Sequence, residues 1–223
     1  MEIKIAKKNE EVESFKDIII VVDFFRFSTT INALVSKRKK IFVFADENKA
    51  IDFYNQNKKF SFFSEKDLNI RKFDNSPYLS LSEKINSNVI VVTNSGSKAV
   101  LASKNAYKII ISSLCNITKT KEFILKNNRK VLIVPACIFF NRDHVEDFYA
   151  SEFLKNFFEN KKTDLKELKE KIINAKRIEE LKKLRKTAEE DIKIIFSVDL
   201  FNTLPVAKIL GDFAEVFDEK SDN

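Results

Sequence analysis

Five short apolar runs, spaced along the chain and separated by helix-forming stretches, constrain the fold more than any other feature of the sequence. Each run is continuous instead of alternating with polar residues, which is typical of strands that are buried on both faces of a parallel sheet. The runs lie at residues 17–23, 40–45, 88–93, 107–112 and 130–136. Because helical patterns follow most of them, we predict an α/β fold, with a layered, mostly parallel or mixed sheet and helices on both faces.

The domain organisation follows from the connecting segments. None of them is rich in Pro, Gly or Ser, so we predict a single compact domain over residues 1–217 and a frayed tail over 218–223. Residues 163–191 carry charges of both signs and predict one or two surface helices. Residues 192–198 and 204–210 are expected to close the sheet, with Gly211 in a turn.

The N-terminus, the length of the apolar runs and the cysteines together predict the cellular compartment. The first residues alternate apolar and polar like an edge strand, and they lack the apolar block of a signal peptide. No apolar run has the length needed to cross a bilayer. Cys115 and Cys137 lie in or beside apolar stretches, which predicts two reduced, buried thiols. We therefore expect a cytoplasmic protein that does not contact a membrane.

The net charge leaves the partner open. Lysine and arginine outnumber aspartate and glutamate by 40 to 33, which gives +7. Such a charge suits nucleic acid, but it suits an anionic small molecule equally well. Acids interleave with the lysines of residues 163–191, which argues against a stripe that follows phosphates. We expect a small anionic molecule as the partner, with nucleic acid the less favoured one, and a homodimer is left open.

Glycine is scarce, which makes each one informative. The chain contains two, Gly96 and Gly211, whereas average usage predicts about fifteen. A chain this poor in glycine keeps one where the backbone requires it, so Gly96 marks a loop that either adopts a positive φ or lets a ligand approach the backbone. Ligands of open α/β sheets bind where strands end and helices begin, and three such junctions carry polar residues.

The first junction joins an acid, an arginine and three hydroxyl groups. Asp23 ends a buried run, Arg26 follows three residues later, and residues 28–30 are Ser-Thr-Thr at the start of a helix. Arg26 can bind an anion through two hydrogen bonds, helix-opening amides add positive potential, and Asp23 suits a hard cation such as Mg²⁺. An Asp23–Arg26 ion pair with a capping hydroxyl is the structural alternative.

The second junction is a run of small polar residues, Thr93-Asn94-Ser95-Gly96-Ser97-Lys98. The amides that follow Gly96 would favour an anion at the helix start. The glycine spacing of a P-loop is missing. An ordinary capped turn is the alternative.

The third junction opens a helix with Glu146 and Asp147. Acids in a first turn stabilise a helix without any further function. If Asp23 lies nearby, however, three convergent carboxylates favour a divalent cation between them. His144, the single histidine, is either a proton donor or a packing residue.

These pieces, in this order, resemble the 2-phosphosulfolactate phosphatase family, of which the chain would be a diverged member. The likeness extends from about residue 17 to residue 210 and rests on short motifs that occur in the family's order. The motif residues are Asp23, Arg26, Ser28, Thr29 and Thr30; Asn75, Ser76 and Pro77; the segment 93–99; 112–116, which includes Asn116; Ala136, Glu146 and Asp147; and Asp199 with Pro205. Most glycines of the family are replaced, and its Gly-Glu-Arg-Gly-Gly stretch is reduced to residues 64–67.

The resemblance implies an enzyme of coenzyme M biosynthesis, which hydrolyses 2-phospho-3-sulfolactate to 3-sulfolactate and phosphate with Mg²⁺. It implies Asp23, Glu146 and Asp147 as metal ligands, and these three with Arg26 as catalytic residues. It also implies a substrate pocket formed by Asn75, Ser76, Thr93, Asn94, Ser95, Gly96, Ser97, Lys98 and Asn116. The alternatives are a non-catalytic relative that binds a small anion or a protein partner and, less favoured, a nucleic-acid-binding protein.

Overall fold

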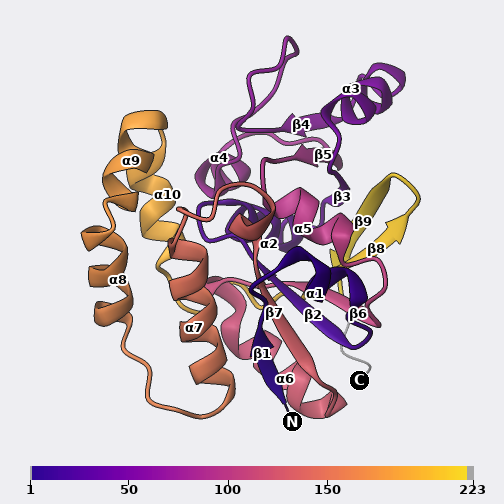
Figure 1. The fold of residues 1–223 in the computed structure, drawn as a ribbon. Helices are drawn as coiled ribbons and strands as arrows, with labels where there is room; N and C mark the ends of the chain where they lie inside the picture. Colours follow the sequence, from indigo (N-terminus) through magenta and orange to yellow (C-terminus); the bar gives the residue numbers. More distant parts are fainter. Residues whose placement is uncertain (1, 220–223) are drawn as a thin grey trace.

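A computed structural model describes residues 2–219, which form one sheet and the helices around it (Figure 1). The strands are β1 (Ile3–Ile5), β2 (Ile18–Val22), β3 (Lys40–Phe44), β4 (Ser61–Phe63), β5 (Asn88–Val92), β6 (Lys108–Ile111), β7 (Val131–Pro135), β8 (Pro205–Leu210) and β9 (Phe213–Asp218). The α-helices are α1 (Asn9–Ser14), α2 (Phe27–Ser36), α3 (Glu47–Gln56), α4 (Pro77–Ser82), α5 (Gly96–Ala102), α6 (Ile117–Asn127), α7 (Glu146–Phe158), α8 (Leu165–Asn174), α9 (Arg177–Leu184) and α10 (Ala188–Ile195). Two short 3₁₀ helices, Leu114–Asn116 and Ala136–Phe139, follow β6 and β7.

The sheet is mostly parallel, as predicted, and each of the five apolar runs is a strand. Its order is β1-β7-β2-β6-β8-β9-β3-β5-β4. Parallel pairing joins β1, β7, β2 and β6 at one end and β3, β5 and β4 at the other. Three antiparallel pairings, through β8 and β9, connect these two groups. Gly211 has a φ of +69° in the turn between β8 and β9, the region that glycine tolerates best.

Helices cover both faces of the sheet because side chains of a strand alternate between its faces. Ile19 and Val21 of β2 belong to a core cluster that includes residues of α2 and α5. Ile18, Ile20 and Val22 belong to a second cluster, with residues of α6, α7 and α8. The continuous apolar run of β2 thus supplies both cores. The helices within residues 2–219 are too short or too polar to traverse a bilayer.

The charged segment 163–195 differs from its prediction. It forms three helices, α8 to α10, where one or two surface helices were expected, and the strand predicted at 192–198 is wrong because α10 extends to Ile195. Ala188, Asp191 and Ile195 are buried at helical spacing, so one face of α10 points inward. This helix packs against α4 (Figure 1).

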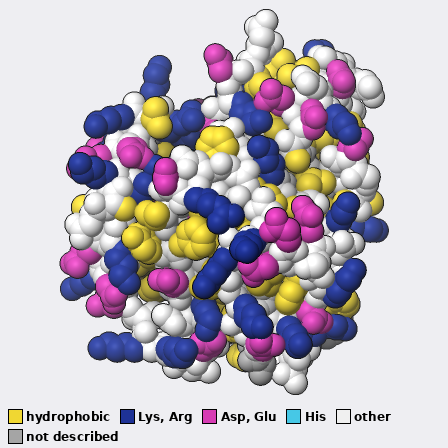
Figure 2. Space-filling model, viewed as in Figure 1, with side chains coloured by type: hydrophobic (Ala, Val, Ile, Leu, Met, Phe, Trp, Pro, Cys, Tyr) yellow, Lys and Arg dark blue, Asp and Glu magenta, His cyan; other side chains and the backbone are white. Residues whose placement is uncertain are grey.

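The outer faces of α8 and α9 carry paired charges. Lys171 lies 2.9 Å from Glu167, and Lys182 lies 3.1 Å from Glu189. Figure 2 shows basic and acidic side chains interspersed over one face of the molecule, without a continuous basic stripe on that face. This distribution gives the nucleic-acid alternative no support.

The C-terminal strand extends further than expected. Asp218 ends β9, and the backbone N–H of Glu219 donates to the carbonyl oxygen of Leu204 at 2.9 Å. Asp218, which was assigned to a frayed tail, is therefore part of strand β9 in the interior of the sheet, and Glu219 is bonded to the residue that precedes β8. The rest of that predicted tail, 220–223, lies outside the described residues.

Candidate active site

A cavity of about 170 Å³ lies where the loops after β2 and β5 meet α9. Its wall combines acids, arginines and a few apolar side chains. It is lined by Asp23, Phe25, Arg26, Glu65, Asn75, Asn94, Ser95, Phe140, His144, Arg177, Glu180, Leu181, Leu184 and Arg185. Five of the residues predicted from sequence to form a site therefore line one cavity: Asp23, Arg26, Asn75, Asn94 and Ser95.

Asp23 is nearly inaccessible, with 4% of its surface exposed, and protein groups hold both of its carboxylate oxygens. The backbone N–H of Phe27, the first residue of α2, donates to Oδ1 at 3.1 Å. The hydroxyl of Ser95 and the backbone N–H of Gly96 donate to Oδ2, at 2.7 and 2.9 Å. These bonds join the first predicted junction to the second and fix the orientation of the carboxylate.

The loop after β5 is held by its own side chains. The backbone N–H of Thr93 donates to Ser97 Oγ at 2.9 Å, and the N–H of Ser97 donates to Thr93 Oγ1 at 3.0 Å. Thr93 and Ser97 thus brace the loop and do not line the cavity. Between them, the N–H of Asn94 donates to Glu65 Oε1 at 2.6 Å, so this loop holds Glu65 as well as Asp23.

Gly96 is required for a reason other than the one expected. Its φ is not positive, and its backbone lies against the ring of Phe27 in α2. A Cβ atom at this position would lie 2.3 Å from Cδ1 of that ring. The absence of a side chain lets the β5 loop reach Asp23.

We expect Gly96→Ala to destabilise the protein by about 1–3 kcal/mol, because the added methyl group overpacks a fully buried contact. Urea unfolding monitored by circular dichroism measures the loss. In a Phe27→Ala background the same substitution should cost less, since the two nearest atoms of the ring, Cδ1 and Cγ, are gone. A Gly96→Ala variant as stable as the wild type would mean that this contact is not tight.

Arg26 is held between two acids. Its Nη1 donates to Asp191 Oδ2 and its Nη2 donates to Asp74 Oδ2, each at 2.7 Å. Asp191, fully buried on α10, also accepts a hydrogen bond from the hydroxyl of Ser76 at 2.6 Å. Arg26 therefore pairs with Asp74 and Asp191, and the Asp23–Arg26 pair considered from the sequence does not occur among the described residues. Ser76 caps α4 and supports this network behind the cavity.

Glu146 and Asp147 are engaged within the protein. Both oxygens of Glu146 accept hydrogen bonds from the guanidinium of Arg177, at 2.6 and 3.0 Å. Asp147 accepts the backbone N–H of Phe24 at 2.7 Å and that of Cys137 at 2.8 Å. Neither residue lines the cavity. Within residues 2–219, no three His, Cys, Asp or Glu side chains are grouped to hold a metal ion. The ligand set Asp23, Glu146 and Asp147 stays a prediction.

Burial and crowding of these carboxylates change their acidity. Burial raises the pKa of Asp147 well above its ordinary value, and repulsion from Asp23 and Glu146 raises it further. Burial likewise raises the pKa of Asp23 and of Glu65. The pKa of His144 is lowered, first by burial and then by the charge of Arg177, so its imidazole is neutral at neutral pH. Several carboxyl groups are thus buried close together at the site, an arrangement that a bound cation or a proton stabilises.

Two predicted binding residues lie away from the cavity. The ammonium group of Lys98 lies over the ring of Phe140, 6.0 Å from its centroid. Asn116 is fully buried, and its Oδ1 accepts the backbone N–H of Ser113 at 2.9 Å in a capping arrangement. Asn116 thus stabilises the turn after β6. Both cysteines are free and buried, as predicted.

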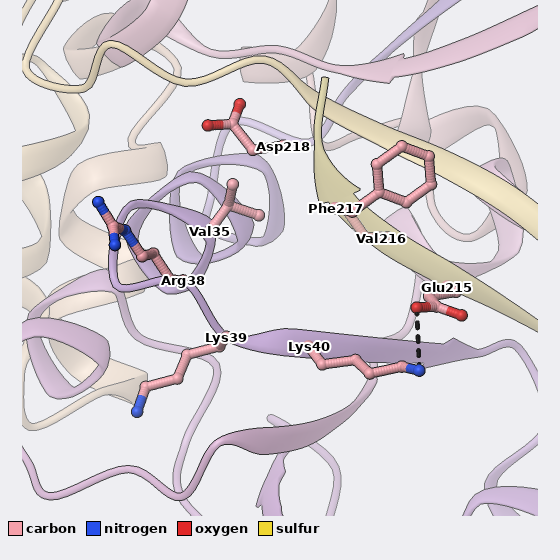
Figure 3. Close-up of a pocket in the computed structure, with 8 residues that line it drawn as sticks. All are labelled: Val35, Arg38, Lys39, Lys40, Glu215, Val216, Phe217 and Asp218. Atoms are coloured by element: carbon pink, nitrogen blue, oxygen red, sulfur yellow. Dashed lines mark ion pairs between the residues drawn. The ribbon is translucent and has the colours of Figure 1, made fainter. Parts of the chain in front are cut away.

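A second, larger cavity of about 680 Å³ lies against β9 and the start of β3 (Figure 3). Its basic side chains are Arg38, Lys39 and Lys40, and the last of these pairs with Glu215 at 3.2 Å. Figure 3 shows Lys39 pointing away from that pair, and its Nζ donates to the carbonyl oxygen of Ile85 at 2.7 Å. Among residues 2–219, no buried acid or predicted site residue faces this cavity, so the smaller one is the candidate active site.

Sequence reasoning missed the contribution of α9 and α10. Helix α9 contributes three residues to the cavity wall, Arg177, Leu181 and Leu184, which are four and three residues apart. Arg185 follows directly after the helix and also lines the cavity. The spacing of the first three places them on one side of a helix, a signal that the many neighbouring lysines and glutamates obscured. Asp191 gave no local signal, because its partner Arg26 is 165 residues away in sequence.

An α/β sheet with an acid- and arginine-lined cavity beyond its strand ends is typical of enzymes that act on small anionic molecules. The profile of the 2-phosphosulpholactate phosphatase family matches residues 4–209. A Thermoplasma volcanium protein named probable 2-phosphosulfolactate phosphatase is 30% identical over 223 residues, covering 94% of this chain and 99% of that protein. Proteins of the same name from Thermoplasma acidophilum (30% identity, 86% and 87% coverage) and Caldanaerobacter subterraneus subsp. tengcongensis (25%, 85% and 87%) are also similar. The chain belongs to the 2-phosphosulfolactate phosphatase family.

Proposed function

We propose that this protein hydrolyses a small phosphate monoester that carries a second acidic group, with 2-phospho-3-sulfolactate as the substrate and 3-sulfolactate and phosphate as the products. The observation that carries the proposal is the meeting of Asp23 with Arg26, Arg177 and Arg185 around one cavity. Family membership supports the phosphatase class, and the names of the relatives support the substrate.

The arginines suit a substrate with several negative charges. A guanidinium group binds phosphate or sulfonate oxygens through paired hydrogen bonds. Arg26 is fixed by two acids, so its position is set before the substrate arrives. Arg185 is partly exposed, and its Nη1 contacts the carbonyl oxygen of Glu65 at 3.3 Å. We assign Arg26 to the phosphate, through the N–H groups that Asp74 and Asp191 do not use, and Arg185 to the second acidic group.

Asp23 is the carboxylate best placed for the chemistry, because it lines the cavity and its three hydrogen bonds fix its position. It acts either as the nucleophile or as the base that takes a proton from the attacking water. The amides and hydroxyl that bind it favour its ionised form against the effect of burial. If Asp23 is the nucleophile, the bond from phosphorus to the alcohol oxygen breaks as an aspartyl phosphate forms, and water then releases phosphate; if Asp23 is the base, water displaces the alcohol oxygen directly. In both cases the alcohol oxygen takes up a proton as it leaves, and negative charge on the phosphoryl oxygens faces Arg26.

The oxygen-rich wall of the cavity also fits Mg²⁺, which the family resemblance implies. Asp23, Glu65 and Asn75 offer oxygen atoms, the donors that Mg²⁺ prefers. When bound, Mg²⁺ would offset charge on the phosphoryl group. Mg²⁺ dependence is part of the proposal.

The test is phosphate release from 2-phosphosulfolactate compared with 2-phospholactate, which lacks the sulfonate. We expect faster release from the sulfonated substrate at low concentration. Arg185→Gln should raise the KM for 2-phosphosulfolactate by roughly 10- to 100-fold, the effect of losing one charged hydrogen-bond donor, and should affect 2-phospholactate less. Lys186→Gln, an exposed neighbour, is the matched control. No release of phosphate from either ester by folded protein would reject the proposal in favour of a non-catalytic anion-binding relative.

A further inference from the structure

Two buried oxygen atoms of the cavity wall lack a hydrogen-bond partner. Oδ1 of Asn75 accepts no hydrogen bond from any residue in the described range, although only 3% of Asn75 is exposed. Oε2 of Glu65 is equally shielded and equally without a partner among residues 2–219. Both residues line the same cavity. Buried acceptors of this kind are nearly always satisfied, so two of them in one cavity indicate a missing positive or donating group.

A third residue of the cavity, Asp23, offers carboxylate oxygen atoms and is held by the same loop as Glu65. The loop after β5 holds Glu65 through the N–H of Asn94 at 2.6 Å and Asp23 through the N–H of Gly96 at 2.9 Å. The two carboxylates therefore bind to amides that are two residues apart, and they are close enough to repel each other. Glu65 remains bonded to the loop through Oε1, which leaves Oε2 for another partner.

Three arginines line the cavity, and each is bonded to other groups of the protein. Arg185 donates to the carbonyl oxygen of Glu65 and to Asp74. Arg26 is bonded to Asp74 and Asp191, and Arg177 is bonded to Glu146 and Glu180. None of these guanidinium groups pairs with the carboxylate of Asp23 or Glu65 within the part of the chain that the structure describes. A small cation that enters the cavity would satisfy both carboxylates and the amide oxygen together.

We infer that Asp23, Glu65 and Asn75 are the protein ligands of a divalent cation, in place of Asp23, Glu146 and Asp147. Mg²⁺ binds through one or two carboxylates and keeps several positions for water and substrate phosphate, so two carboxylates and an amide oxygen form a sufficient set. Glu146 and Asp147 are left out of this set because neither lines the cavity, whereas Asp23, Glu65 and Asn75 do. The inference rests on the proposed function in one respect: phosphoryl oxygens of the substrate would occupy coordination positions of the cation that the protein does not fill.

The experiment measures Mn²⁺ binding to the full chain without substrate, by calorimetry and by the paramagnetic signal of free Mn²⁺. Glu65→Gln removes one charge, and Asn75→Leu removes the amide oxygen at similar volume. Each should weaken Mn²⁺ binding at least about tenfold. Glu179→Gln changes an exposed acid of α9 that does not line the cavity, and should leave Mn²⁺ affinity unchanged. Circular dichroism and thermal unfolding establish that each variant is folded.

The inference is overturned if folded wild-type protein binds no Mn²⁺, or if Glu65→Gln and Asn75→Leu bind it as tightly as the wild type. Loss of Mn²⁺ binding in Glu146→Gln but in neither of those variants would restore the other ligand set and overturn it too. The proposed hydrolysis and the proposed cation site can be rejected independently of each other. Phosphate release that persists in EDTA rejects the cation site and keeps the phosphatase, whereas the predicted Mn²⁺ binding without release keeps the site and rejects the substrate.

Discussion

Asp23→Asn is expected to lower the turnover number for phosphate release from 2-phosphosulfolactate by about 10²- to 10⁴-fold, the usual contribution of a positioned acid or base. The substitution keeps the shape of the side chain. Its Oδ1 can still accept the N–H of Phe27, and its Nδ2 can donate to the Ser95 hydroxyl. The N–H of Gly96 loses its acceptor, which costs about 1–3 kcal/mol of folding free energy. Steady-state phosphate release and urea unfolding measure the two effects.

The comparison variant for Asp23→Asn is Asp212→Asn, an exposed acid in the β8–β9 turn that pairs with Lys49. It should leave the turnover number and the stability unchanged. The stereochemistry at phosphorus of a substrate with an isotopically chiral phosphoryl group then separates the two roles of Asp23. Retention means two displacements and identifies Asp23 as the nucleophile, whereas inversion means a single displacement by water and identifies it as a base. Wild-type turnover by Asp23→Asn would remove Asp23 from the chemistry altogether.

The sheet could be predicted because each central strand carries its own signal. Residues 17–23 are apolar on both faces, and such a run has few alternatives to a buried strand. The junction of Asp23 and Arg26 was equally visible, because strand ends in α/β sheets adjoin helix starts. In both cases the information lies within a few neighbouring residues.

The remainder of the site depends on partners distant in sequence. Glu65 lies in an aperiodic stretch, and the N–H of Asn94 in the loop after β5 holds it at the cavity. Arg177 lies in a segment whose charges are typical of a solvated surface, yet it is bonded to buried Glu146. Charge pattern alone does not distinguish an exposed helix from one that closes a cavity, since the two differ only in what each helix packs against.

Asp191→Ala is expected to destabilise the protein by about 3–5 kcal/mol, because it leaves the Arg26 guanidinium buried with one partner fewer. Arg26 is 2% exposed, and Asp191 is fully buried. Asp191 also accepts the Thr187 hydroxyl at 2.8 Å and the N–H of Tyr78 at 3.0 Å. The loss would be a large part of the total stability of a typical domain, about 5–15 kcal/mol. Urea unfolding measures it directly.

A double variant decides whether Asp191 acts through Arg26. Arg26→Met with Asp191→Asn removes both charges and keeps acceptors for Ser76 and Tyr78, so it should be less destabilised than Asp191→Ala while phosphate release is lost. Asp191→Asn alone should remain folded, with a raised KM because Arg26 is no longer fixed. Glu189→Gln, whose partner Lys182 is exposed, should change stability by less than about 0.5 kcal/mol. If the losses from Arg26→Met and Asp191→Asn simply add, the two side chains are not coupled, and α10 serves stability without positioning the arginine.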